Sequence, residues 1–182
     1  MSKRSDNETI YLGSGDLMIK EYTDEMPKYT DFDASTDLLG RISGGATLEY
    51  KPTFYEAKDD SGKVSKVIIT EEEATLKSGI MTWNGATLKQ LCSTARVTEA
   101  GGVRTVKIGG VGNHDGKSYA LCFHHTDKVD GDVWILIRGV NQAGFSLAFA
   151  KDKETIIDAE IKCLPMDDDG TLIEYNEEIA TA

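Results

Sequence analysis

Apolar and charged residues alternate strictly near the C-terminal end of the chain. From Ile157 to Cys163 every second residue is apolar, and the residues between them are charged. A period of two places the apolar set on one face of an extended segment and the charged set on the other. The pattern predicts a half-buried strand, over residues 155–163, that closes a sheet whose outer surface meets water or a polar neighbour.

Turn-forming residues separate further strand candidates in the second half of the chain. Asn113 to Gly116, Asp130-Gly131 and Asp169-Gly170 combine Asn or Asp with Gly at hairpin spacing. The segments between such turns are alternating or wholly apolar and rich in β-branched and aromatic side chains. This spacing predicts an antiparallel meander. The expected strands cover residues 103–108, 118–126, 133–140, 145–149 and 155–163.

A long hairpin is expected over residues 46–78. Two strand candidates, 46–57 and 64–78, are joined by the polar loop KDDSGK. In the second strand, alternation puts Val67 and Ile69 on one face with glutamates, and Ala74 on the other face, so burial is expected to change face along the strand. Pro52 lacks a ladder donor, which favours an edge, a bulge or a bend. The hairpin is therefore predicted to bend or project.

One helix is expected, over residues 84–95. Asn84 is suited to the N-cap, and Leu88, Leu91, Cys92 and Ala95 form a narrow apolar stripe. Upstream, the first forty residues predict one short strand and a polar loop, with residues 1–15 as an N-terminal arm. The fold class predicted for the single domain, residues 1–182, is mainly β: an antiparallel β-sandwich or small barrel with one flanking helix and a long projecting hairpin.

Charge and composition exclude several classes of function. The chain has 31 acidic and 20 basic residues, a formal net charge of −11, which argues against nucleic-acid binding through a basic patch. No apolar run is long enough for a signal peptide or a membrane span, so a soluble cytoplasmic product with no membrane partner is expected. Cys92, Cys122 and Cys163 lie far apart among apolar neighbours and are interpreted as core residues, not as a disulfide or metal set.

Candidate chemistry is sparse, and no enzyme activity, cofactor or metal is expected. His124 and His125 are adjacent in a strand, so they point to opposite faces; one buried and one exposed histidine is favoured over ligation or catalysis. The acidic turn of Asp167, Asp168 and Asp169 lacks the spacing of a calcium loop and suits a tight reversal. No serine lies in a nucleophile elbow.

Three segments carry a resemblance to a known family. They are the opening YLGSGDLMI, the central LGRISGGATLEYKPTFYEAKDDSGKVSKVIITEEEATLKSGIMTWN with the helix after it, and the closing VNQAGFSLAFAKDKETIIDAEIKCLPMDDDGTLIEY. Together they resemble the major tail protein of tailed bacteriophages, the tail tube subunit of phages and prophages of Gram-positive hosts. The same tube fold occurs in contractile bacteriocins and type VI secretion systems, so a tube subunit of a contractile bacteriocin or secretion-type injection system is an alternative.

The resemblance implies a structural function. Six subunits would form a ring with a continuous inner β-barrel, and rings would stack into a channel through which the tape measure protein and then DNA pass. Expected partners are further copies of the chain, the tape measure protein, the tail terminator and the baseplate or tail-tip proteins. The expected location is the virion tail, assembled in the cytoplasm of the host bacterium. Whether the tail contracts stays open.

Physical reasoning adds candidate residues to this hypothesis. Exposed strand edges of the long hairpin would pair between subunits and close a ring. An acidic channel would repel phosphates, and Glu49, Glu71 and Glu73 are the lumen candidates, with a solvated outer face as the alternative. Contacts between subunits or rings are expected from the arm and from the hairpin loop, at Tyr11, Leu12, Lys58, Asp59, Asp60 and Lys63.

A function of another class is a carbohydrate-binding β-sandwich module. Such a module usually presents a row of exposed aromatic rings that stack on sugars. Trp83 and Trp134 are instead assigned to the core, which favours the tube hypothesis.

Overall fold

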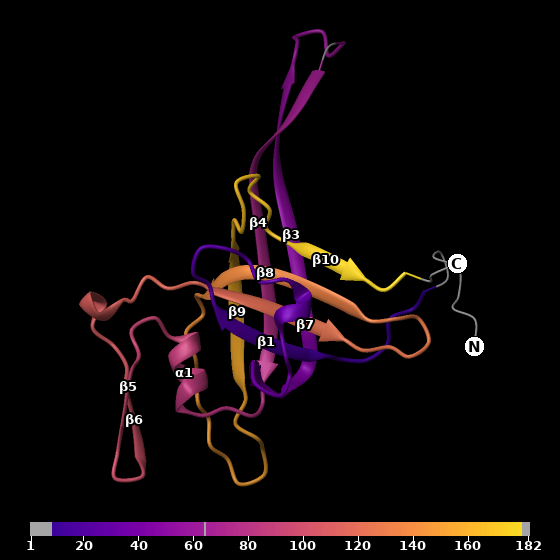
Figure 1. The fold of residues 1–182 in the computed structure, drawn as a ribbon. Helices are drawn as coiled ribbons and strands as arrows, with labels where there is room; N and C mark the ends of the chain where they lie inside the picture. Colours follow the sequence, from indigo (N-terminus) through magenta and orange to yellow (C-terminus); the bar gives the residue numbers. More distant parts are fainter. Residues whose placement is uncertain (1–8, 64, 180–182) are drawn as a thin grey trace.

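A computed structural model describes residues 9–63 and 65–179, and the structural statements below concern these residues. The chain is mainly β, with one short helix and a long projecting hairpin, as predicted (Figure 1). One antiparallel sheet of eight strands has the order β2-β1-β7-β8-β9-β4-β3, and its eighth strand, β10, pairs with β8. These strands are β1 (Asp16–Glu21), β2 (Leu38–Gly40), β3 (Ile42–Lys58), β4 (Ser65–Ile80), β7 (Tyr119–His125), β8 (Val133–Asn141), β9 (Ile157–Leu164) and β10 (Glu174–Glu177).

Smaller elements complete the fold. A second sheet contains β5 and β6, and one α-helix and two turns of 3₁₀-helix connect the strands. Their bounds are β5 (Arg96–Ala100), β6 (Val103–Lys107), α1 (Gly85–Leu91), η1 (Tyr29–Asp31) and η2 (Val111–Asn113).

The large sheet curls around one main core. In Figure 1, β3, β4 and β9 cross the direction of β1, β7 and β8, so two halves of one continuous sheet face each other. Their inner faces supply the buried side chains, and each large aliphatic side chain among them contributes about 1.5–3 kcal/mol by burial. The cluster contains Leu17, Ile19, Leu39, Ala74, Leu76, Ile80, Leu91, Leu121, Ile137, Ile157, Ala159, Ile161 and Cys163.

The strand read from the alternating pattern is confirmed as β9. Its buried residues alternate with the exposed or half-exposed Asp158, Glu160 and Lys162. On one side β9 pairs with β4, where Ile161 lies opposite Leu76, and on the other side it pairs with β8. The charged face of β9 is therefore part of a sheet surface that points away from the core.

A second, smaller core lies on the outer face of β1, β7 and β8. Met18, Cys122 and Leu136 are buried there against Met26 and Phe32 of the loop between β1 and β2. Both faces of this half of the sheet are thus covered, which explains the three successive buried residues of β1. The polar loop expected from the sequence has a structural role as a lid over this face.

The helix is shorter than predicted. Asn84 is the N-cap, and its side-chain oxygen accepts hydrogen bonds from the backbone N–H groups of Ala86 (2.7 Å) and Thr87 (3.4 Å). The helix ends at Leu91, not at residue 95, because the side-chain amide of Asn141 donates to the Leu91 carbonyl (3.0 Å) and Cys92 is extended. A contact from a distant strand thus ends the helix.

One strand prediction was wrong, and another strand was missed. Residues 145–149 are not a strand, and the edge of β9 opposite β4 pairs instead with β8, at Ile161–Leu164. Phe145 and Leu147 nevertheless pack against the core. Conversely, β5 was missed, because its polar sequence, RVTEA, pairs only with β6 and buries little.

Candidate assembly surface

The β3–β4 hairpin continues well beyond the rest of the sheet (Figure 1). It is longer than predicted at its inner end, since β3 begins at Ile42 and β4 ends at Ile80. Strand β9 pairs only with Thr75–Ile80 of β4, whereas β3 is the last strand of the sheet and has no second neighbour among the described residues. The outer part of the hairpin therefore has two free edges with unpaired backbone groups, which are templates for pairing with another chain.

A bulge resets the faces of the hairpin. Thr53 pairs with Glu71 but Phe54 pairs with Ile69, so one extra residue lies on β4. Directly opposite residues share a face, and β3 alternates without interruption from Ala46 to Lys58. The predicted change of face along β4 is wrong, because the extra residue places Val67 and Ile69 on the same face as Ala74 and the core.

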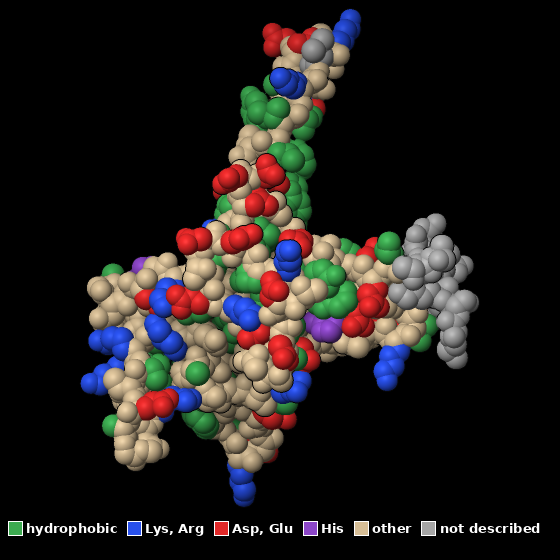
Figure 2. Space-filling model, in the orientation of Figure 1, with side chains coloured by type: hydrophobic (Ala, Val, Ile, Leu, Met, Phe, Trp, Pro, Cys, Tyr) green, Lys and Arg blue, Asp and Glu red, His purple; other side chains and the backbone are tan. Residues whose placement is uncertain are grey.

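Apolar side chains are exposed on both faces of the outer hairpin. Phe54 and Ile69 are 58% and 51% exposed on the face that continues the core, and Tyr55 and Ile68 are 58% and 47% exposed on the opposite face. Figure 2 shows apolar side chains along the projecting stem. An isolated two-stranded ribbon is marginally stable in water, and exposed apolar patches mark interaction sites. The outer hairpin thus has the properties of an interface without its partner.

Glu49, Glu71 and Glu73 lie together on one face of the hairpin, opposite the core. Lys51 lies across from Glu73, and Thr53 from Glu71, on the same face. The structure thus brings the three lumen candidates into one surface, and it adds Lys51 and basic and acidic residues of neighbouring strands. The sequence pattern placed Asp158, Glu160 and Lys162 on an outer face, but it did not reveal that β9 pairs with β4.

Three lysines of this charged face, Lys51, Lys77 and Lys162, form ion pairs with carboxylates of the same face. The Nζ–Oε distances are 2.9 Å for Lys51–Glu49, 3.2 Å for Lys162–Glu73 and 3.7 Å for Lys77–Glu160. The hydrogen bond from Lys51 lowers the pKa of Glu49 and raises that of Lys51 itself. Such exposed pairs add little stability, but they neutralise the positive charges on a face that carries more carboxylates than lysines.

The loop residues predicted to contact other subunits lie at the tip of the hairpin. The Asp59 carboxylate accepts a hydrogen bond from the Ser61 N–H (3.3 Å), and the Asp59 carbonyl accepts one from the Gly62 N–H (2.9 Å). Lys58 pairs with Glu56 at 3.1 Å. Asp60 and Lys63 are exposed. The tip is a local turn far from the main core, accessible to a neighbouring molecule.

The other predicted contact residues, Tyr11 and Leu12, lie at a different part of the molecule, beside β10. The Tyr11 hydroxyl donates to a carboxylate oxygen of Glu177 (3.1 Å), and the Tyr175 hydroxyl lies 3.3 Å from the Tyr11 hydroxyl. Leu12 is 78% exposed. Residues 1–8 of the predicted arm are outside the described residues, whereas residues 9–15 have no regular secondary structure. The structure therefore does not join the arm and the hairpin tip into one surface.

The histidines have structural partners. His125 is buried, and its Nδ1 donates to the Ser14 carbonyl (2.7 Å), whereas the half-exposed His124 contacts Asp132 (2.8 Å) and stacks on Trp134. They point in different directions, as the sequence predicted. No group of three or more His, Cys, Asp and Glu side chains in residues 9–63 and 65–179 is arranged to hold a metal ion.

The cysteines and tryptophans belong to the packed interior. Cys122 and Cys163 are buried and Cys92 is half-buried, and burial raises the thiol pKa of Cys122 to about 12 and that of Cys163 to about 11. Such thiols are poor nucleophiles at neutral pH. Trp83 packs against the main core and donates to the Thr155 carbonyl (2.8 Å), and Trp134 packs in the second core.

Comparison with protein-family models and with curated proteins found no match. In the described part of the chain, no helix has the length and apolar character needed to cross a membrane.

Proposed function

We propose that the protein is the structural subunit of a phage tail tube. Identical copies form hexameric rings, and the rings stack into a hollow channel that carries the tape measure protein and then DNA. The observation that supports this most is the β3–β4 hairpin, which leaves two edges and two apolar faces uncovered outside the body of the molecule. No partner other than another chain satisfies both the edges and the faces of such a ribbon.

The strand directions favour a closed ring. Strands β3 and β4 are antiparallel within one subunit. A rotation that brings β4 of one copy beside β3 of the next makes the new pair antiparallel as well, so the hairpins form one antiparallel barrel. A head-to-tail contact with a closing rotation gives cyclic symmetry, and closure removes every free edge.

The charged face suits the wall of such a channel. Glu49, Glu71 and Glu73 would face the lumen with the carboxylates of β9, and the ion pairs hold Lys51, Lys77 and Lys162 beside carboxylates. Lysines bind DNA phosphates, so pairing these three lysines with carboxylates would help DNA to pass without specific binding. The charged face pointing to outside solvent is the competing orientation.

The remaining contacts and partners follow from this arrangement. The hairpin tip, with Lys58, Asp59, Asp60 and Lys63, and the segment of Tyr11 and Leu12 would contact adjacent subunits or rings. Tail terminator and baseplate or tail-tip proteins would close the two ends, and the assembled protein would lie in the virion tail after assembly in the bacterial cytoplasm. A tube of a contractile bacteriocin or secretion-type injection system would use the same surfaces.

Negative-stain electron microscopy of the purified full-length protein tests the proposal. Hexameric rings or tubes are expected, because the exposed hairpins pair between copies. A protein that stays monomeric at all concentrations and salt conditions, and that binds glycans on an array, would instead favour a carbohydrate-binding module and would refute the tube.

A further inference from the structure

The only strongly basic part of the described chain is a lobe formed by α1, β5, β6 and η2. We refer to residues 84–117 as the basic lobe. It has five basic and two acidic residues, a net charge of +3 in a chain of net charge −11. The rest of the chain therefore carries −14. In Figure 2, lysine and arginine side chains gather over this lobe, and aspartate and glutamate side chains gather near the base of the long hairpin.

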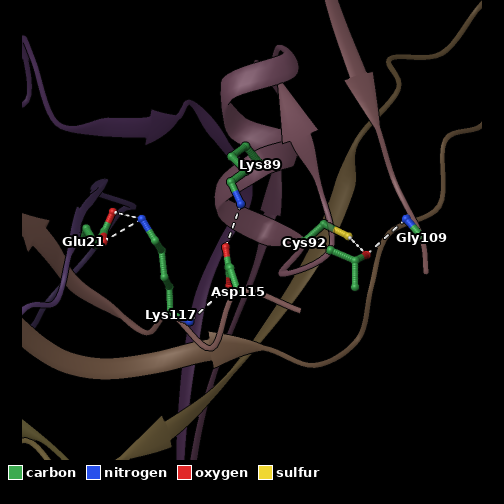
Figure 3. Close-up of polar contacts among 7 residues, drawn as sticks. Glu21, Lys89, Cys92, Gly109, Asp115 and Lys117 are labelled. Atoms are coloured by element: carbon green, nitrogen blue, oxygen red, sulfur yellow. Dashed lines mark hydrogen bonds and ion pairs between the residues drawn. The ribbon is translucent and has the colours of Figure 1, made fainter. Parts of the chain in front are cut away.

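Polar contacts connect the parts of the basic lobe to one another and to β1 of the body. Lys89 of α1 pairs with Asp115 (2.6 Å), and Lys117 pairs with Glu21 at the end of β1 (2.8 Å), as Figure 3 shows. Asp115 also accepts a hydrogen bond from the Lys117 N–H (3.1 Å). The Gly109 N–H donates to Thr94 (3.2 Å). The lobe therefore has internal polar contacts and one ion pair, Lys117–Glu21, to the body.

Two like charges oppose each other on the basic lobe. Arg96 of β5 lies directly across from Lys107 of β6, and both are exposed. Like charges in opposed positions destabilise a strand pair. Within the described residues neither side chain pairs with a carboxylate, and Arg96 makes one hydrogen bond to the Gly109 carbonyl (3.4 Å). Val111 of η2, which follows β6 in the sequence, is 93% exposed. The pair has the features of a site for an acidic partner.

An acidic recess lies elsewhere on the same molecule. It is a cavity of about 540 Å³ between the turn after β1 and the turn after β9. Its lining includes the carboxylates of Asp24, Glu25, Asp167 and Asp168. We refer to this cavity as the acidic recess. Arg138 also lines it, but its guanidinium stacks on Tyr22 (4.0 Å) and donates to the Pro165 carbonyl (2.8 Å).

The two surfaces are placed for contact between different copies. In Figure 1 the turn after β9 lies at the base of the long hairpin, at the end of the body opposite the β5–β6 tip. One copy therefore presents a basic surface at one end and an acidic one at the other. This arrangement gives a head-to-tail contact and disfavours a symmetric dimer, because like surfaces repel each other.

We propose that the basic lobe of one copy docks on the acidic recess of a second copy, with Arg96 and Lys107 facing Asp24 and Asp168. The inference rests on the proposed function for its setting, since stacking of subunits requires such a head-to-tail contact. Two complementary charged surfaces steer association and fix the orientation of the partner, and salt weakens their attraction.

A charge-swap experiment tests the contact. Arg96→Glu/Lys107→Glu should slow self-association at low salt by about tenfold, measured by light scattering and sedimentation velocity. Asp24→Arg/Asp168→Arg should have a similar effect. Mixing the two double variants, or combining all four changes in one chain, should restore association to near the wild-type rate. Lys151→Glu/Lys153→Glu, a matched charge change in an exposed loop outside the lobe, should have little effect.

Distinct outcomes contradict the docking and the tube function. If Arg96→Glu/Lys107→Glu forms tubes as well as the wild-type protein does, the docking alone would be overturned. The same follows if the variant with all four changes associates no faster than either double variant. Charge-dependent head-to-tail dimers without rings or tubes would support the docking and contradict the tube. A labelled DNA duplex that loses binding in Arg96→Glu/Lys107→Glu, with unchanged self-association, would assign the lobe to nucleic acid and overturn the proposal.

Discussion

Phe54 lies directly opposite Ile69 across the long hairpin, and both side chains are more than half exposed. The pair is on the face that continues the main core, because the bulge on β4 brings Ile69 into line with Ala74 and Leu76. The apolar face of the sheet thus extends past the domain that it stabilises. Covering this extension requires a second molecule, which makes the pair the most direct link between the fold and the proposed assembly.

Replacing Phe54 and Ile69 by serine should abolish assembly without unfolding the subunit. The side chains are exposed in the monomer, so the free energy of unfolding should change by about 0.5 kcal/mol or less. Urea denaturation measures the stability, and electron microscopy measures the assembly. Val129→Ser/Ile179→Ser, which removes two exposed apolar side chains outside the hairpin, is the control and should assemble normally. Normal tubes from the Phe54 and Ile69 variant would remove the hairpin face from the interface.

Leu76→Ala should destabilise the subunit strongly. Leu76 is buried in the C-terminal part of β4, between Leu48 of β3 and Ile161 of β9. The truncation leaves a cavity in the main core, and its expected cost is about 2–5 kcal/mol. Urea denaturation followed by circular dichroism measures the change. Lys77→Ala, at the neighbouring exposed position, should cost about 0.5 kcal/mol or less. Similar losses for both variants would contradict the assignment of the core face.

Asp115→Asn should change the pH dependence of stability. Burial of Asp115 alone would raise its pKa, but hydrogen bonds from Lys89 and the Lys117 backbone, with the charges of both lysines, outweigh it and lower the pKa below 3.8. A lowered pKa gives stability that is present above pH 3.8 and lost as the pH falls through the folded-state pKa. In thermal unfolding, the melting temperature of Asp115→Asn should therefore be lower than that of the wild type at neutral pH. The two melting temperatures should converge in acid.

The control for this measurement is Asp60→Asn, the same chemical change at the exposed hairpin tip. It should leave the melting temperature close to that of the wild type at neutral pH. A difference in melting temperature between wild type and Asp115→Asn that stays constant down to the most acidic pH would contradict the role of the ionised carboxylate.

Glu71→Lys/Glu73→Lys should make assembled tubes retain DNA. The change reverses two charges on the proposed lumen wall and frees Lys162 from its pair with Glu73. Added lysines bind phosphates, and the retention should weaken steeply as salt increases. Co-sedimentation of a short labelled duplex with tubes measures it. Asp152→Lys/Glu154→Lys, in an exposed loop, is the matched control, and equal retention by both variants would show that the charged face is not the channel wall.

The sequence predicted those elements that local patterns determine. The alternation at Ile157 to Cys163 identified β9, and Asn84 was correctly assigned as the N-cap. Errors arose where a distant residue decides the outcome. Asn141 ends the helix at Leu91, and β9 pairs with β4 and β8 and not with residues 145–149. Neither of these long-range contacts can be predicted from the local pattern of apolar and polar residues.

The candidate site could be predicted only in part, for the same reason. Alternation places Glu71 and Glu73 on one face of β4, as predicted, and the register places Glu49 with them. The neighbouring charges of β9 join this face only through pairing between strands that are about eighty residues apart. The extra residue at the bulge also reversed the predicted face of Val67 and Ile69.

Cryo-electron microscopy of the polymer formed by the purified protein tests the central proposal most directly. We predict a hollow tube in which β3 of each subunit pairs with β4 of the next around the channel, with Glu71 and Glu73 facing the bore. Solitary molecules, or polymers whose hairpins project unpaired into the outer solvent, would contradict it.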